Sequence, residues 1–306
     1  MNALEPLVLP IEAYLPEIAS RLLDDGALVL SAEPGAGKTS LVPPAIAEAI
    51  AAAQGSRSAA AKVLVMEPRR VAAVSAASRI AEVWDKKLGT DVGYRVRGES
   101  STSPRARVEA VTPGVLIRMI QNDPGLEDVG CVILDEFHER SAQADLALAL
   151  LSQSRELRPE LRILAMSATI DTAQAAKALN TGLLEVPGRS FPINTRYKKM
   201  VLGDRPLDSD FFTAIAHSAQ DLLEESDGDV LIFLPGAAEI SRAASAFLGV
   251  CPSAEVVILH GSLPLDAQRR ALSPSPSAPP RAMEISPSMA PAAAPAYWRA
   301  DPSPAA

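Results

Sequence analysis

The sequence has few aromatic residues, two cysteines and three histidines. Aromatic residues make up 4% of its 306 residues, which excludes a dense platform on which nucleic-acid bases could stack. Cys131 and Cys251 lie far apart and have no metal-ligating partners nearby in the sequence. We therefore expect neither a disulfide framework nor a zinc site, and we interpret both cysteines as reduced residues of a cytoplasmic protein.

The sequence also lacks an excess of basic residues and any long apolar run. Its formal net charge is −8 at pH 7, so a protein that coats nucleic acid by bulk electrostatics is not indicated, and any contact requires a local patch. No apolar run is long enough to span a bilayer, and no basic stretch precedes the first apolar residues. We expect no membrane partner and no signal peptide.

Apolar runs alternate with helical patterns over the first part of the chain, and this pattern predicts an α/β fold. Short apolar runs bounded by turns are typical of strands buried on both faces, and helices between them imply βαβ units in a parallel sheet. Helices are expected at 11–24, 39–52, 70–84 and 141–155, and from Pro113 onward. Strands are expected at 27–31, 62–67, 107–112, 131–136 and 162–168.

The pattern starts again after Gly188, which predicts a second α/β domain. Helices are expected at 210–225 and 237–248, and strands at 229–236 and 255–261. From 273 to 306 the composition changes, because 25 of these 34 residues are Pro, Ala or Ser. Such a segment buries too little apolar area to offset its ordering entropy. We therefore expect domains at 1–188 and 189–272, followed by a disordered tail at 273–306.

A glycine-rich loop between the first predicted strand and the next helix predicts a phosphate-binding site. Gly35 and Gly37 allow backbone N–H groups to turn toward an anion, at the N-terminus of a helix whose dipole favours negative charge. Lys38 would reach the β- and γ-phosphates of ATP, and the Thr39 hydroxyl would ligate Mg²⁺. A chance glycine turn is the alternative. The candidate ATP-binding residues are Ala32, Glu33, Pro34, Gly35, Ala36, Gly37, Lys38, Thr39 and Ser40.

Two carboxylates follow a later apolar strand, at the end where ligands bind in open α/β sheets. Asp135 would hold Mg²⁺, and Glu136 would position and deprotonate the attacking water. Taken alone, two acidic residues after a strand are more often a solvated loop. Their place about a hundred residues after the glycine-rich loop favours the second half of an ATPase site.

Several further segments resemble the motifs of superfamily 2 helicases. In chain order these are GAGKT, EPRRVAA (Glu67–Ala73), TPGVL (Thr112–Leu116), DEFHER (Asp135–Arg140), SAT and LIFLPGAAEI (Leu231–Ile240). The chain is similar to the DEAH-box helicases, and the DEFH variant, the ADLALAL run and LHGSLPLDAQRRAL (Leu259–Leu272) most resemble their bacterial HrpB-type branch. The resemblance covers about residues 5–273. It implies a P-loop RecA-like motor domain, followed here by an incomplete second RecA-like domain.

The resemblance implies roles for residues that spacing alone would not single out. His138, with Ser167, Ala168 and Thr169, would couple ATP hydrolysis to movement of the bound strand, although small hydroxyl residues also commonly end strands and cap helices. Arg79 matches a position that stacks on adenine; the ordinary alternative is a surface arginine. The residues implied in contacts with the nucleic-acid backbone, RNA more than DNA, are Arg69, Arg70, Thr112, Pro113 and Gly114.

The chain departs from the helicase pattern after Leu272, where no later motif follows. The absent motifs would supply arginines that complete the ATP site, so we expect a truncated motor with weak or no unwinding. A non-catalytic fragment that binds ATP and nucleic acid is the alternative. The glycine-rich loop alone also permits a P-loop ATPase of another kind, but the full set of motifs counts against that reading.

Overall fold

The computed structural model describes residues 9–54, 62–168, 173–188, 193–198, 209–225, 229–261, 263–272 and 281–285. The chain divides into two compact units, Met1–Phe191 and Pro192–Ala306. We treat each unit by itself. Among the described residues, no helix combines the length and the apolar character needed to cross a membrane.

The first unit is built on an eight-stranded sheet with the order β4-β3-β5-β2-β6-β7-β1-β8. Neighbouring strands are parallel except β3 and β4, which form an antiparallel pair. The strands are β1 (Ala27–Ala32), β2 (Lys62–Met66), β3 (Val92–Val96), β4 (Glu99–Ser101), β5 (Val108–Val111), β6 (Val129–Leu134), β7 (Arg162–Ser167) and β8 (Leu183–Val186). The expectation of a parallel α/β sheet is confirmed.

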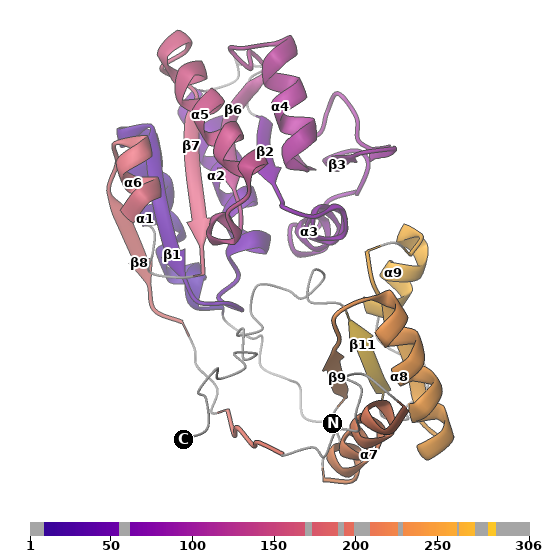
Figure 1. The fold of residues 1–306 in the computed structure, drawn as a ribbon. Coiled ribbons are helices and arrows are strands. Elements are labelled where there is room, and N and C mark those ends of the chain that lie inside the picture. The colour runs from indigo at the N-terminus through magenta and orange to yellow at the C-terminus, as the bar shows by residue number, and fades with distance from the viewer. Residues whose placement is uncertain are drawn as a thin grey trace. The chain divides into compact units, whose positions relative to one another are not determined.

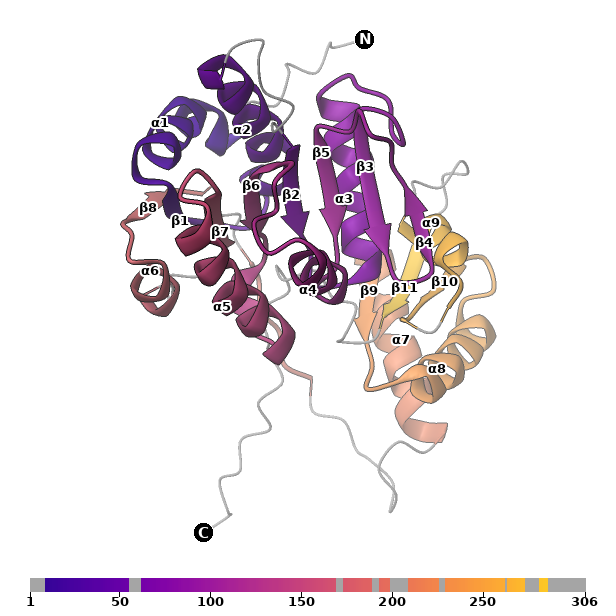
Figure 2. The same cartoon turned by 90° about the horizontal axis from the view of Figure 1, so that it is seen from above.

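Helices cover both faces of this sheet, which explains why its central strands are continuously apolar. Figure 2 shows α1 and α2 on one side of the strands and α5 and α6 on the other. Leu116 of α4, Leu151 of α5 and Leu179 of α6 pack in one cluster with Leu64 and Val132 of the sheet. The helices are α1 (Leu15–Asp25), α2 (Lys38–Gln54), α3 (Arg70–Val83), α4 (Pro113–Asn122), α5 (Ala142–Leu157) and α6 (Ala173–Leu179), with 3-10 turns η1 (Pro10–Tyr14) and η3 (Phe137–Glu139).

The parallel arrangement brings the carboxyl ends of the strands to one edge, and Figure 1 shows the arrowheads of β1 and β7 pointing the same way. The glycine-rich loop follows β1, Asp135 follows β6 and Ala168 follows β7. Strand β6 ends at Leu134 rather than at Glu136 as expected, so both candidate carboxylates lie in the turn after the strand. Residues far apart in the sequence therefore meet at this edge.

Four elements of the first unit were not predicted. Strands β3 and β4 form a hairpin whose turn contains Gly98 at φ +84°, a conformation that favours glycine. Both strands are short and carry polar residues, so they lack the apolar run that marks the other strands. Helix α6 and strand β8 follow SAT, and both are too short for their periodicity to stand out in the sequence.

The second unit has a three-stranded parallel sheet with the order β10-β11-β9. Its core includes Phe247 and Ala216 in one cluster and Ile240 and Phe212 in another. The elements are α7 (Ser209–Glu225), β9 (Val230–Phe233), α8 (Ala237–Val250), β10 (Glu255–Leu259), α9 (Leu265–Leu272) and β11 (Arg281–Ile285). The predicted helices and strands of this unit are present, with bounds that differ by a few residues.

Strand β11 corrects the expectation of a tail without regular structure from 273 to 306. It pairs with both β9 and β10 and is the middle strand of its sheet. The average composition of the tail hides this strand, because Arg281–Ile285 (RAMEI) contains neither proline nor serine. The other residues of that segment lie outside the described residues.

The packing of the first sheet predicts a large difference between two leucines. Leu64 of β2 is fully buried, whereas Leu157 at the end of α5 is 70% exposed. Leu64→Ala is expected to lower the free energy of unfolding by about 2–5 kcal/mol, because a cavity remains in the cluster that Leu64 shares with Leu116 of α4 and Leu151 of α5. The matched control Leu157→Ala should change it by about 0.5 kcal/mol or less. Urea denaturation followed by circular dichroism measures both, and equal losses would contradict the assigned core.

Candidate functional site

The glycine-rich loop folds as a tight turn between β1 and α2. The Ala36 N–H donates to the Glu33 carbonyl at 3.2 Å, and Gly35 and Gly37 have φ of +78° and +97°. A Cβ atom at position 37 would lie 2.9 Å from Leu9 Cδ1. Glycine is therefore required at position 37 for both the backbone conformation and the close approach of the preceding chain.

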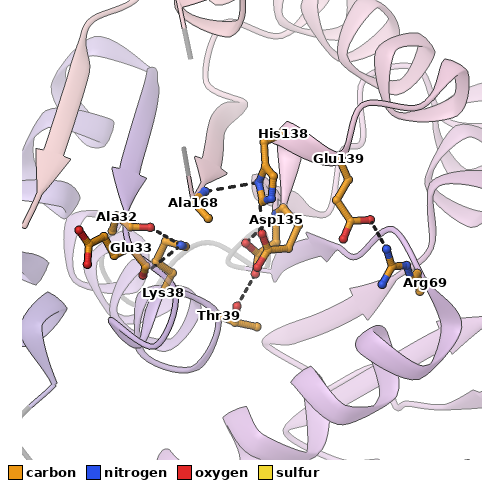
Figure 3. Close-up of polar contacts among 10 residues, drawn as sticks. Ala32, Glu33, Lys38, Thr39, Arg69, Asp135, His138, Glu139 and Ala168 are labelled. Carbon is orange, nitrogen blue, oxygen red and sulfur yellow. Dashed lines mark hydrogen bonds and ion pairs between the residues drawn. The ribbon is translucent and has the colours of Figure 1, made fainter. Parts of the chain in front are cut away.

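Lys38 is the first residue of α2 and is only 5% exposed. Its ammonium group donates to the carbonyl oxygens of Ala32 and Glu33, the latter at 3.4 Å (Figure 3). Burial lowers the pKa of Lys38, while the nearby charges of Glu136 and Asp135 raise it. The loop thus holds a buried cation on its own carbonyl groups at the point where a phosphate would lie.

Thr39 connects the loop to the turn after β6. Its hydroxyl donates to Asp135 Oδ2 at 2.5 Å, across 96 residues of sequence (Figure 3). Asp135 is 1% exposed, and its other oxygen accepts from the Glu136 N–H at 2.8 Å. Its own N–H donates to the Met66 carbonyl at 3.0 Å. The two halves predicted from the sequence therefore form one site with a fixed carboxylate.

Glu136 occupies a left-handed backbone conformation, with φ 48° and ψ 38°. Such a conformation is strained for a residue other than glycine and is common at functional sites. Burial, followed by the charge of Asp135, raises the pKa of Glu136 from 4.5 to about 7. A carboxyl group with a pKa near neutrality is suited to accept a proton from water.

His138 lies in η3 and joins the turn after β6 to the end of β7. The Ala168 N–H approaches His138 Nδ1 at 3.4 Å, so this nitrogen accepts (Figure 3). Burial lowers the pKa of His138, which favours the neutral ring, and the same Nδ1 lies 3.3 Å from Glu136 Oε2. Ser167 is buried at the end of β7, whereas Thr169 lies outside the described residues. His138 thus contacts the segment predicted to couple hydrolysis to movement.

Two carboxyl groups of the site were not assigned a role from the sequence. Glu67 is 3% exposed, and burial, followed by the charge of Asp135 and a hydrogen bond with it, raises the pKa of Glu67 well above its ordinary value. Glu139 pairs with Arg69. Knowledge that β2 pairs with β6 would have been needed to find these two carboxyl groups. Met66 lies opposite Leu134 in this pairing, and the residues that follow the two strands emerge side by side.

The candidate nucleic-acid contacts begin two helices at the same edge of the sheet. Arg69 and Thr112 precede α3 and α4, and the strands before these helices, β2 and β5, are neighbours. Arg70 and Gly114 are exposed, whereas Pro113 is buried. The structure therefore brings the two predicted segments together, with two helix N-termini that favour anions.

Two of the candidate ATP-binding residues have local partners. Arg79 is 58% exposed at its side chain and forms an ion pair at 2.8 Å with Glu82, one turn along α3. This is the ordinary surface arrangement that the sequence left open as the alternative to adenine stacking. Ser40 donates to the Gly37 carbonyl at 3.3 Å, so its hydroxyl supports the loop.

The donors at this site fit Mg²⁺. Magnesium prefers oxygen ligands and takes one or two protein ligands together with water and substrate phosphates. The Thr39 hydroxyl and the Asp135 carboxylate meet at 2.5 Å beside the glycine-rich loop. In the described part of the chain, no cluster of three or more His, Cys, Asp and Glu residues forms a cage of protein ligands. A metal held partly by phosphate oxygens matches this donor set.

Comparisons with known proteins show which family this chain is similar to. The family described as DEAD/DEAH box helicase matches residues 15–178. The ATP-dependent RNA helicase HrpB of Escherichia coli is 41% identical over 277 residues, covering 88% of this chain and 32% of that protein. The ATP-dependent RNA helicase HrpA homolog of Haemophilus influenzae is 35% identical over 243 residues, covering 79% of this chain and 18% of that protein.

A solved structure gives the same result for the fold. The crystal structure of the Escherichia coli DEAH/RHA helicase HrpB matches with a TM-score of 0.77 and 38% identity, over 91% of this chain and 34% of that one. The chain therefore spans about a third or less of the length of these relatives. The expected fold class and the expected resemblance to the HrpB-type DEAH-box helicases are both confirmed.

The raised pKa of Glu136 predicts a pH-dependent stability in metal-free buffer. Between its ordinary pKa of 4.5 and its folded value of about 7, the folded chain keeps a proton that the unfolded chain has lost. The melting temperature should therefore fall as the pH rises through about 7. Glu136→Gln should reduce this slope, whereas Glu156→Gln, an exposed residue of α5, should leave it unchanged. Identical slopes in all three proteins would contradict the raised pKa.

Proposed function

The chain belongs to the DEAD/DEAH box helicase family, and we propose that its first unit binds ATP with Mg²⁺ and hydrolyses it to ADP and phosphate. The observation that carries this proposal is the contact between Thr39 and Asp135. It joins a phosphate-binding loop to a buried carboxylate, which are the two halves that phosphoryl transfer requires. Bound Mg²⁺ would neutralise charge on the phosphate oxygens.

Lys38 and the loop would bind the phosphates. Two loop carbonyls hold the ammonium group, and an incoming phosphate oxygen is a stronger partner for it than a neutral carbonyl. Gly35 and Gly37 keep the loop free of side chains at its turns, and α2 begins at Lys38. The α2 N-terminus, the buried cation and the loop amides then act on the same anion.

Glu136 would accept a proton from the attacking water. The neighbouring Asp135 carboxylate is fixed by hydrogen bonds from the Thr39 hydroxyl and the Glu136 N–H. Glu136 itself lies beside it in a strained turn. His138 Nδ1 lies 3.3 Å from Glu136 Oε2 and 3.4 Å from the Ala168 nitrogen, so His138 joins Glu136 to the segment after β7. This contact supports a coupling role for His138, Ser167, Ala168 and Thr169.

Nucleic acid, and RNA before DNA, is the proposed substrate along which hydrolysis drives movement. The names of the relatives, ATP-dependent RNA helicases, support RNA. The starts of α3 and α4 present Arg70 and Gly114 at the edge of the sheet that also carries the ATP site. Contacts of this kind bind phosphates without reading base sequence.

We expect ATP turnover to depend on Glu136 more than ATP binding does. Glu136→Gln should lower turnover by about 10²- to 10⁴-fold, because a general base is lost, while ATP binding is retained. Lys38→Ala should weaken ATP binding itself. Turnover by the purified chain, measured beside the exposed control Glu156→Gln, tests both. If the native chain binds ATP but turns it over no faster than Glu136→Gln, the non-catalytic reading is favoured instead.

Nucleic-acid binding is expected to depend on Arg70 in a sequence-independent way. Arg70→Gln should weaken binding of single-stranded RNA of different sequences to a similar extent and reduce the salt slope by about one. Arg21→Gln, which removes an exposed arginine of α1 paired with Glu17, is the matched control. Fluorescence anisotropy at several salt concentrations, with RNA and DNA strands of the same sequence, measures this. Equal binding by Arg70→Gln and the native chain would remove Arg70 from the interface.

A further inference from the structure

An ion pair links the predicted nucleic-acid edge to the turn that carries the ATP-site carboxylates. Arg69 Nη2 lies 3.0 Å from Glu139 Oε2, and the two side chains are 31% and 21% exposed (Figure 3). Arg69 precedes α3, whereas Glu139 ends η3 and stands four residues after Asp135. The pair therefore spans the two segments that the proposed function assigns to different ligands.

The turn holds Glu139 in a fixed place. Phe137 is buried, and the Arg140 guanidinium lies 5.4 Å from the centre of its ring and pairs with Asp145 at 2.9 Å. Glu136 and Arg140 both have positive φ, at 48° and 33°, which a turn retains only when its surroundings fix it. The carboxylate of Glu139 is thus presented to Arg69 by an anchored segment.

Arg70, the next residue, is in a different situation. It is exposed at the first position of α3 and forms no ion pair with any residue that the structure describes. Arg69 is half-buried and bound to a carboxylate. The two adjacent arginines have the same expected role but differ in one respect. A phosphate must displace the Glu139 carboxylate to bind Arg69, and it need not do so to bind Arg70.

We propose that Glu139 is a positioning residue, which holds Arg69 while no nucleic acid is bound and competes with a backbone phosphate for it. The inference rests on the proposed binding of nucleic acid. Carboxylate and phosphate are both bidentate partners of a guanidinium group, and two anions close together repel each other. A phosphate that binds Arg69 must therefore weaken the pair with Glu139.

Release of Glu139 would act on the turn that carries the ATP-site carboxylates. Glu139 lies four residues after Asp135, and its N–H donates to the Glu136 carbonyl at 2.9 Å. A phosphate that takes Arg69 from Glu139 therefore removes a contact from this turn, which gives nucleic acid a route to alter turnover.

The test is a double-mutant cycle on the full chain, with a fluorescent single-stranded RNA as the probe. Glu139→Gln should tighten binding by about two- to fivefold, the range expected for releasing a partly exposed ion pair. Its salt slope should become steeper by up to about one, because Arg69 then contacts phosphate without competition from the Glu139 carboxylate. The loss caused by Arg69→Gln should be larger in the Glu139→Gln background than in the native chain.

Matched variants separate this inference from the proposed function. Arg70→Gln should cause the same loss in both backgrounds, because the structure pairs Glu139 with Arg69 and not with Arg70. If Arg70→Gln weakens binding but Arg69→Gln costs the same with and without Glu139, the inference is wrong and the proposed function stands. If the native chain binds no RNA, the inference and the proposed binding of RNA are both wrong.

Glu139→Asp, with a shorter reach to Arg69, is a second variant and should bind RNA with an affinity between those of the native chain and Glu139→Gln. Binding weaker than that of the native chain would also overturn the inference.

Discussion

The hydrogen bond between Thr39 and Asp135 is the contact on which the arrangement of the site depends. It exists because β1 and β6 are parallel strands of one sheet, with β7 between them, so that both end at the same edge. A short hydroxyl on the first turn of α2 then reaches a carboxylate that follows β6. The fold thus brings Thr39 and Asp135 close together, and the oxygen atoms of their side chains define a position that a cation would occupy.

The site is crowded with negative charge. Glu67, Asp135, Glu136 and Glu139 lie close enough to affect one another, and Lys38 and Arg69 are the cations that act on them. Burial, followed by the negative charge of Asp135, raises the pKa values of Glu67 and Glu136, so both groups hold a proton to a higher pH than usual. Mg²⁺ bound beside Asp135 would oppose this effect, and Glu136 would lose its proton more readily. Binding of a metal beside Asp135 and loss of the proton at Glu136 would therefore be linked by electrostatics.

Much of this architecture could be predicted from the sequence, because continuous apolar runs and a glycine-rich turn are local signals. The glycine-rich loop, Asp135 and Glu136 were found in this way, and the structure brings them together. The hairpin of β3 and β4 was missed since Gly93 and Arg95 interrupt the apolar residues of β3 and since β4 is only three polar residues long. Strand β11 was missed since its neighbours in the sequence are rich in proline and serine. Glu67 and Glu139 acquire their roles only from the side-by-side placement of strand ends, which depends on sheet order and has no local signal.

Arg69 and Arg70 show the same limit of prediction from sequence for two adjacent residues. Both are arginines, and both were predicted to contact phosphates of the nucleic-acid backbone. Arg69 has an extended backbone, with φ −129° and ψ 148°, whereas Arg70 is the first residue of the helix. The change of direction at a helix start sends adjacent side chains to different surroundings, one toward the anchored carboxylate of Glu139 and the other into solvent. The surroundings of the two arginines are thus decided by where α3 begins, and Glu139, four residues after Asp135, pairs with the first of them.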